Sequence, residues 1–411
     1  MNIIISHPTS NQNNRAAVNG LLQNQILFEF HTSLAFFPGS VSEKLSAINI
    51  FKEIKRRSFL KELKPYTKTS PFTEGGRILS GKFGFNKLIE NEKSLFSIDS
   101  VYEDLDKKTA KRLRKLPNNN TVSAIYAYED GAYHSFKQAK HSNIACLYDL
   151  PIGYWRTARD LLAKEIEIWP EWAPTLTGFQ DSEDKLQKKD EELAMADSIF
   201  VASSFTAKSL NSYPGKLAPI KVIPYGFPKP VDNRNYKHLK RPLKLLFVGG
   251  LSQRKGIANM FAAVEKLLPH VQLTVIGGKL NNDCEILNNK LLKHKWIPSL
   301  PHEKVLEQMR MHDILLFPSL FEGFGLVITE AMSQGTPVIT TDRTAGPDLI
   351  EHGINGWLVQ AGSTESLQSC IEDILEQPSQ IEKVGKAAIA TAKKRPWDVY
   401  GKELAKAISS Q

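Results

Sequence analysis

The sequence contains few cysteines, and this excludes two classes of protein. Its 411 residues include three cysteines, Cys146, Cys284 and Cys370. An odd number of widely separated cysteines provides neither a disulfide framework nor the spacing of a zinc site. We therefore expect all three to be small, buried hydrophobic residues.

Long hydrophobic runs are also missing, because no stretch reaches the roughly 18 apolar residues of a membrane-spanning helix. The opening MNIIIS predicts a buried strand and has no basic leader. We expect a cytoplasmic protein, with peripheral contact at the inner face of the membrane left open. No internal repeat or low-complexity tract is present, and a chain 41% hydrophobic is long enough for two domains.

Two further absences concern cofactors. No G-x-G-x-x-G follows the first predicted strand, which argues against a nicotinamide-dependent dehydrogenase. The triplet Asp104-Leu105-Asp106 has the form of a metal-binding acid pair, but it precedes a lysine-rich helix and not a buried strand. We therefore expect neither a metal nor another cofactor.

The charge is unbalanced, at +9 with an isoelectric point near 9.2. Basic residues concentrate in two segments that we expect to be helical, residues 52–64 and 107–115. An anionic membrane surface is one partner for them, since each basic residue near the bilayer contributes about 1 kcal/mol. Ordinary solvated helix faces are the alternative, and no nucleic-acid-binding motif accompanies the charge.

The most informative stretch is residues 313–362. Within it, residues 314–317 predict a short buried strand, residues 326–333 a helix, and residues 337–341 a second buried strand. A strand, helix and strand in succession predict a parallel sheet with its ligand crevice at the carboxyl ends of the strands. The loop before the helix should therefore line that crevice.

That loop has the residues of a nucleotide-sugar site. Gly323 and Gly325 would let a ligand approach the backbone, and the amides that follow open a helix whose positive end favours phosphate. A carboxylate such as Glu330 can accept two hydrogen bonds from a ribose diol. Glu322, at the strand end, would then lie closer to the transferred sugar.

Glu322 and Glu330, inside PSLFEGFGLVITEAMSQGTPVI, resemble the E-x7-E signature of family-4 retaining glycosyltransferases. Other segments also resemble that family: residues 196–210 with 222–228, residues 245–256 and residues 395–404. The resemblance implies the α/β fold called GT-B, two Rossmann-like domains whose parallel sheets face a central cleft. It implies an acceptor-side domain at 1–226, a linker at 227–241, a nucleotide-sugar-binding domain at 242–395, and a terminal helix at 396–411 that crosses back.

A cationic pair, Arg254 and Lys255, follows a predicted strand and the turn Gly249-Gly250. Lys255 matches the lysine of the family, whereas Gly250 stands where an arginine is common. We expect Arg254 to supply that guanidinium, because a metal-free site must meet the charge of a leaving diphosphate with arginine, lysine and backbone amides. The expected donor-binding residues are Gly249, Gly250, Arg254, Lys255, Glu322, Gly323, Phe324, Gly325, Leu326, Val327 and Glu330.

The acceptor side is less familiar. Ser10, Asn11 and Asn13 replace the glycines that the family commonly has near its start, and Tyr148 replaces a histidine before Asp149. A tyrosine hydroxyl can still hydrogen-bond a sugar. Our acceptor-side candidates are Ser10, Asn11, Asn13, Tyr128, Glu129 and Tyr148, and our catalytic candidates are Glu322, Lys255, Arg254 and Asp149.

The resemblance implies a metal-independent hexosyltransferase of glycan biosynthesis. It would move a sugar, with retention, from a UDP-sugar or GDP-sugar to a glycan or lipid-linked acceptor hydroxyl. Two alternatives stay open: a sugar-nucleotide 2-epimerase, and a non-catalytic protein of this fold that binds glycan or membrane.

Overall fold

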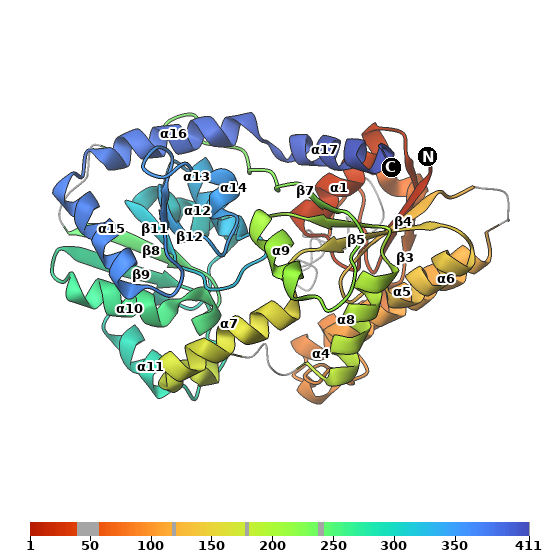
Figure 1. The fold of residues 1–411 in the computed structure, drawn as a ribbon, viewed down its shortest axis with the longest axis horizontal. Helices are drawn as coiled ribbons and strands as arrows, with labels where there is room; N and C mark the ends of the chain where they lie inside the picture. Colours follow the sequence, from red (N-terminus) through yellow and green to blue (C-terminus); the bar gives the residue numbers. More distant parts are fainter. Residues whose placement is uncertain (39–56, 117–120, 177–180, 237–241, 411) are drawn as a thin grey trace.

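The computed structural model describes residues 1–38, 57–116, 121–176, 181–236 and 242–410. Two parallel sheets, each covered by helices, make up the two halves of this part of the chain (Figure 1). The central strands are buried runs, as in Ile3–Ser6 and Ile314–Phe317. Such continuous apolar runs are typical of parallel strands with helices on both faces.

The first sheet has seven strands in the order β3-β2-β1-β4-β5-β6-β7. Its strands are β1 (Ile3–Ser6), β2 (Leu27–Thr32), β3 (Thr67–Thr69), β4 (Ala124–Tyr128), β5 (Ala145–Leu150), β6 (Ser198–Val201) and β7 (Ile220–Val222). The helical segments between them are α1 (Gln12–Gln23), η2 (Lys61–Tyr66), α4 (Pro71–Lys82), η3 (Asn86–Leu88), α5 (Ile98–Arg114), α6 (Tyr133–His141), α7 (Trp155–Ile168), η4 (Pro170–Thr175), α8 (Glu183–Met195), α9 (Ser204–Ser209) and η5 (Leu210–Ser212).

The second sheet has six strands in the order β10-β9-β8-β11-β12-β13. Its strands are β8 (Leu243–Val248), β9 (Val271–Ile276), β10 (Lys295–Ile297), β11 (Ile314–Phe317), β12 (Val338–Thr341) and β13 (Trp357–Val359). The helical segments are η6 (Gln253–Lys255), α10 (Ile257–Lys266), α11 (Glu285–Leu292), α12 (His302–Met311), α13 (Leu326–Ser333), α14 (Gly346–Leu349), α15 (Thr364–Glu376), α16 (Gln380–Lys394) and α17 (Trp397–Ser409).

The strand order locates a crevice in each half. Chain direction across the sheet reverses between β1 and β4 in the first sheet, and between β8 and β11 in the second. In open parallel sheets, ligands bind beyond the carboxyl ends of the strands at such a switch point. The loops after β8 and β11 are therefore the first place to search for a site.

Two stretches of chain connect the halves, and they run side by side. The first stretch passes Phe227 and the second passes Arg395, just before α17. The Phe227 backbone amide donates to the Arg395 carbonyl at 2.8 Å, so the two stretches are hydrogen-bonded to each other. Beyond that point α17 lies against α1 (Figure 1), and a Cβ added at Gly20 would meet the Gly401 carbonyl oxygen at 2.1 Å. The last described helix therefore packs on the first.

One element departs from the expected division of the chain. Trp172 of η4 is buried and stacks on Phe261 of α10, with ring centroids 5.9 Å apart. The Thr175 hydroxyl also accepts a hydrogen bond from the Gln253 amide at 2.9 Å. Residues at the end of α7 and in η4 thus pack on the second half, although they belong to the first 226 residues.

Two predictions fall partly outside the described residues, namely the 227–241 linker beyond residue 236 and the basic segment 52–64 before residue 57. The second basic segment lies in α5 and its C-terminal cap, as the helical prediction requires. All three cysteines are buried and free, as expected. Among the described residues, no helix is both long and apolar enough to cross a membrane.

Candidate donor site

Three charged side chains meet where β8 and β11 end. Lys255 and Arg254 lie in the short helix η6 after β8, and Glu322 lies in the loop after β11. The Lys255 ammonium contacts the Glu322 carboxylate directly. Arg254 Nη1 lies 3.3 Å from the same carboxylate and donates to the Phe321 carbonyl at 2.8 Å. The structure therefore brings Arg254 and Lys255 to the same carboxylate.

The environment of this cluster is nearly dry, since the side chains of Lys255 and Glu322 are 13% and 14% exposed. Burial lowers the pKa of Lys255 well below its usual range, and the neighbouring charge of Arg254 lowers it further. Contact with the Glu322 carboxylate opposes this effect, because an opposite charge favours the ammonium form. A second anion arriving here would meet two poorly solvated cations.

The helix α13 begins next to this cluster. Its N-cap is Gly325, whose φ of +88° is a left-handed conformation that side chains rarely adopt. A Cβ there would also meet the Phe317 ring at 2.7 Å. The first turn of α13 carries no side-chain cap, so its amides are of the kind that bind phosphate at helix N-termini.

Glu330 lies one turn further along α13 and is partly exposed. Its Oε1 lies 2.9 Å from Nε2 of His302, the first residue of α12. The hydrogen bond to Glu330 raises the pKa of His302. His302 is a residue that our sequence reasoning missed, and its only signal is its place at a helix start after the β10 loop.

The role expected for Gly323 needs correction. A Cβ at this position would lie 1.9 Å from the Pro151 carbonyl oxygen, so the glycine faces the other half of the molecule and not a ligand. The Gly323 carbonyl accepts hydrogen bonds from Ser203 and Thr206 of the first half, at 2.5 and 2.9 Å. The loop that carries Glu322 is thus held between the two sheets.

The other expected donor residues differ in their surroundings. Phe324 is buried against Tyr225, with ring centroids 4.9 Å apart, and Leu326 and Val327 pack at the edge of the core. Because these three side chains pack against other residues, their backbone groups are the part that a ligand would contact. Gly250 is open, because a Cβ there would meet nothing nearer than Leu280 at 3.8 Å.

Asp149 and Tyr148 end β5 with opposite orientations. The Asp149 carboxylate is buried and accepts a 2.5 Å hydrogen bond from the Tyr126 hydroxyl. Burial raises its pKa to about 7, although the bond from Tyr126 acts in the other direction. Tyr148 points away, and its hydroxyl donates to Glu192 at 3.0 Å. The hydroxyl expected to reach a sugar is therefore used inside the first half.

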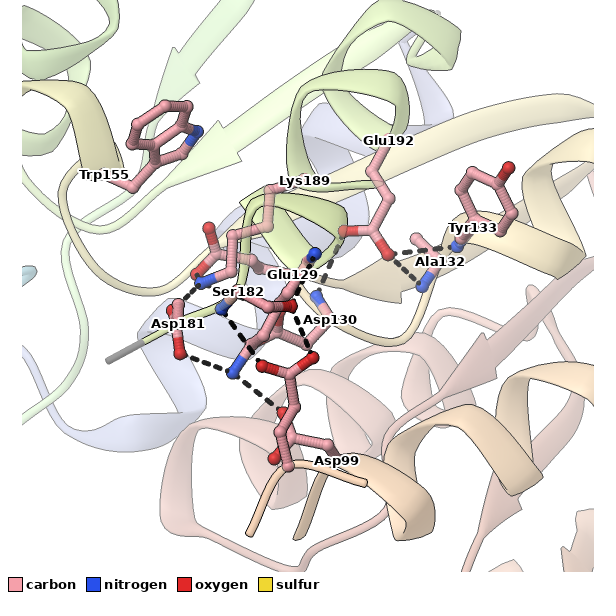
Figure 2. A network of polar contacts seen from close by, with 12 residues as sticks. Asp99, Glu129, Asp130, Ala132, Tyr133, Trp155, Asp181, Ser182, Lys189 and Glu192 are labelled. Atoms are coloured by element: carbon pink, nitrogen blue, oxygen red, sulfur yellow. Dashed lines mark hydrogen bonds and ion pairs between the residues drawn. The ribbon is translucent and has the colours of Figure 1, made fainter. Parts of the chain in front are cut away.

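Glu192 belongs to a polar network beside β4 (Figure 2). Its carboxylate accepts hydrogen bonds from the backbone amides of Ala132 and Tyr133, at 2.9 and 3.0 Å, where α6 begins. In the same network, Lys189 lies 3.6 Å from the carboxylates of Glu129 and Asp130. Glu129 is thus an ion-pair partner in the first half, and burial raises its pKa to about 7.

The remaining acceptor-side candidates surround the start of α1. Asn11 caps this helix, because its side chain accepts from the Asn14 amide at 3.1 Å. Asn13 is buried and donates to the Tyr225 hydroxyl at 3.1 Å. Ser10 is only partly buried just before the cap, and Tyr128 is buried at the end of β4 against the His7 ring. Asn11 and Asn13 therefore hold the connection between β1 and α1 in place.

A charged cavity of about 330 Å³ lies beside the Figure 2 network, and sequence reasoning did not find it. Its walls come from α5, α6 and α8, so no contiguous motif marks it. Opposite charges such as Lys185 and Asp99, 2.8 Å apart, neutralise each other across it.

Asp104 and Asp106 have different partners, and the Asp104 carboxylate accepts from the Lys108 ammonium at 2.7 Å. Both lie in α5, and the buried Asp106 carboxylate accepts from the amides of His134 and Ser135 at the start of α6. Within the described part of the chain, no group of three or more histidine, cysteine or acidic side chains could hold a metal ion.

Comparison with solved structures identifies the architecture. Sucrose-phosphate synthase from Thermosynechococcus elongatus superimposes with a TM-score of 0.66 at 16% identity, covering 100% of this chain and 98% of that one. HepE from Anabaena, solved in complex with UDP-glucose, gives a TM-score of 0.62 at 16% identity, with full coverage of both chains. The fold is GT-B.

Sequence similarity to known proteins lies in the second half, where residues 229–391 match the family model for glycosyl transferases group 1. Glycogen synthase of Mycobacterium tuberculosis is 28% identical over 156 residues, which are 36% of this chain and 37% of that protein. Sucrose synthase of Melioribacter roseus is 30% identical over 174 residues, 36% of this chain and 22% of that protein. The match therefore spans well under half the length of these relatives.

Proposed function

We propose that the protein transfers a sugar, with retention of configuration, from a nucleoside-diphosphate sugar to an acceptor hydroxyl. Lys255 and Arg254 bind the diphosphate, together with backbone amides at the start of α13. Glu330 binds the ribose and Glu322 the sugar. We assign Asp149 to the acceptor side.

The observation that carries this proposal is the meeting of Lys255, Arg254 and Glu322 at the switch point of the second sheet. Two partly buried cations next to an uncapped helix start form a site for a dianion, because both supply positive charge in a poorly solvated place. An ordinary surface ion pair is exposed to water. This cluster lies beyond the ends of β8 and β11 and is largely shielded from water.

The same geometry suggests how the donor is used. An incoming diphosphate competes with Glu322 for both cations, since it carries more charge than a carboxylate. Glu322 is then free to accept hydrogen bonds from sugar hydroxyls. The cations neutralise the charge that develops on the leaving diphosphate, so no metal is required in this proposal.

The donor and acceptor are proposed as classes. HepE was solved with UDP-glucose, which makes a UDP-sugar the first donor to test, with a GDP-sugar second. The acceptor is a glycan or lipid-linked hydroxyl that enters from the first half. Peripheral contact with an anionic membrane would bring a lipid-linked acceptor to the cleft.

A thermal-shift screen against UDP-, GDP- and ADP-sugars, with and without magnesium, tests the donor site, because a ligand that binds the folded state raises its apparent stability. We expect a magnesium-independent shift from one nucleotide, which Lys255→Ala abolishes. Lys244→Ala is the matched control, since Lys244 is an exposed lysine on β8. No shift from any donor, or an equal shift in Lys255→Ala, would contradict the assignment.

Turnover separates the proposal from its alternatives. We expect nucleotide release to depend on an added acceptor and the product to keep the anomeric configuration of the donor. Epimerised sugar nucleotide formed without acceptor would indicate a 2-epimerase. Donor binding without turnover on any acceptor would indicate a non-catalytic protein of this fold.

A further inference from the structure

The first half exposes an unusual set of apolar side chains around α4 and η3. All three exposed phenylalanines of the described residues lie here: Phe72, Phe83 and Phe85, with 72%, 65% and 60% of their surface exposed. Single exposed apolar residues are ordinary, whereas several together mark an interaction site. We call the exposed Phe72, Leu79, Phe83, Phe85, Leu88 and Leu95 the α4–η3 apolar surface.

The local backbone holds part of this surface outward. Gly84, with φ +74°, ends α4 in the left-handed conformation, and the Phe85 amide donates back to the Ser80 carbonyl at 2.8 Å. In this kind of helix end, a hydrophobic residue after the glycine normally packs on the last turn. Phe85 is exposed instead, as is Phe83 before the glycine.

The exposed charges around these rings are mostly basic. Residues 75–89 contain Arg77, Lys82 and Lys87, and the exposed Glu90 follows them. The nearest acid before them, Glu74, is fully buried and paired with Arg57 and Arg77. Lys82 and Lys87 are both exposed, on either side of the two phenylalanines. Beside the two phenylalanines, the exposed Lys82 and Lys87 therefore outweigh the exposed Glu90.

We propose that the α4–η3 apolar surface docks onto an anionic lipid membrane, with Phe83 and Phe85 inserted among the lipids and Lys82 and Lys87 at the headgroups. Aromatic and aliphatic side chains beside lysines suit the membrane interface, where apolar burial and attraction to anionic lipid add. This surface differs from the basic segments at residues 52–64 and 107–115, which were selected for charge alone, because it combines basic charge with exposed apolar side chains.

A second copy of the chain is the competing occupant. In a two-fold contact, the same patch meets itself, so Lys82 and Lys87 of the two copies would be brought together. Like charges at such a contact oppose it, whereas anionic headgroups favour it. Figure 1 places α4 at the end of the first half opposite α17, away from the contact between the first and last helices.

This proposal adds a membrane-docking surface to the proposed function. It rests on that function only for the use of a lipid-linked acceptor. It is tested by co-sedimentation of the full chain with vesicles of phosphatidylcholine, with and without phosphatidylglycerol, and without any sugar nucleotide. Donor binding is measured separately without vesicles, so either idea can fail alone.

We expect binding to the phosphatidylglycerol vesicles that weakens with salt. Phe83→Ser with Phe85→Ser should reduce the partition coefficient at least roughly tenfold, since two rings no longer insert. Lys82→Ser with Lys87→Ser should remove the preference for anionic lipid. Leu292→Ser, at an 86% exposed leucine of the second half, is the matched control and should bind like the wild type.

All of these positions are exposed, and unchanged thermal unfolding of each variant confirms that it is folded. Absence of vesicle binding by the wild type, or equal binding by the phenylalanine variant, would overturn the proposal. So would concentration-dependent self-association that the phenylalanine substitutions abolish, without vesicle binding.

Discussion

Replacing Gly323 with alanine tests how closely the loop of Glu322 is held between the halves. The added Cβ would lie 1.9 Å from the Pro151 carbonyl oxygen and 2.6 Å from the Ile152 Cα. Ordinary contacts are about 3.5–4.0 Å, so backbone must move by roughly 1.5 Å to relieve the overlap. Gly323 is not among the residues with positive φ, so alanine fits its backbone conformation and only the contact is perturbed.

The cost should resemble that of other overpacked sites, about 1–3 kcal/mol. Either the Pro151 segment shifts or the two halves separate, and both disturb the hydrogen bonds from Ser203 and Thr206 to the Gly323 carbonyl. We therefore expect Gly323→Ala to lower the free energy of unfolding or to increase the radius of gyration. It should also weaken donor binding, because Glu322 is the preceding residue.

Chemical denaturation, small-angle scattering and donor titration measure these effects. Gly250→Ala is the control, since its Cβ would meet only Leu280 at an ordinary 3.8 Å, and we expect its stability to change by less than about 0.5 kcal/mol. If Gly323→Ala matches the wild type in all three measurements, the loop is not held against the first half as described.

Three further changes test other parts of the structure. Glu330→Ala should weaken donor binding by about 1–3 kcal/mol, the scale of a lost polar partner, and unchanged affinity in calorimetry would count against the ribose assignment. Burial would raise the pKa of Glu29, but hydrogen bonds from His31 and Arg112 lower it to about 2, against 4.5 when unfolded. Its stabilising contribution is therefore complete above about pH 4.5 and is lost toward pH 2; Arg112→Gln should reduce this acid-dependent loss in denaturation curves, and an unchanged curve would refute it. Burial raises the pKa of Asp149 to about 7 from 3.8, so its ionisation should cost stability progressively between these values and fully above pH 7. Asp149→Asn should flatten that pH dependence of the melting temperature, and parallel wild-type and mutant profiles would contradict the shift.

Much of the second half could be predicted from sequence because its elements are strongly patterned. The buried run at residues 314–317 and the helix at 326–333 have the predicted bounds in β11 and α13. The predicted strand at 337–341 is β12, one residue shorter. Glycine and proline at both ends of α13 set these limits locally, without help from tertiary contacts.

The orientation of side chains was harder to predict. Tyr148 and Asp149 are neighbours on one strand, so they must point to opposite faces of the sheet, and only the fold decides which partner each one meets. Gly323 looked like a place for a ligand, but its neighbour Pro151 is distant in sequence. The packing of η4 on the second half likewise depends on the contact of Trp172 with Phe261, which no local pattern signals.

The paired connections between the halves have a mechanical consequence. Because the backbone at Phe227 is bonded to that at Arg395, and the Arg395 guanidinium donates to the Pro224 carbonyl at 2.5 Å, the two crossings cannot bend independently. Opening and closing of the cleft would thus rotate about a single hinge at this point, and α17 would travel with the first sheet while α16 travels with the second. Such a hinge would let the distance between the loops of the two halves vary while keeping those loops in register.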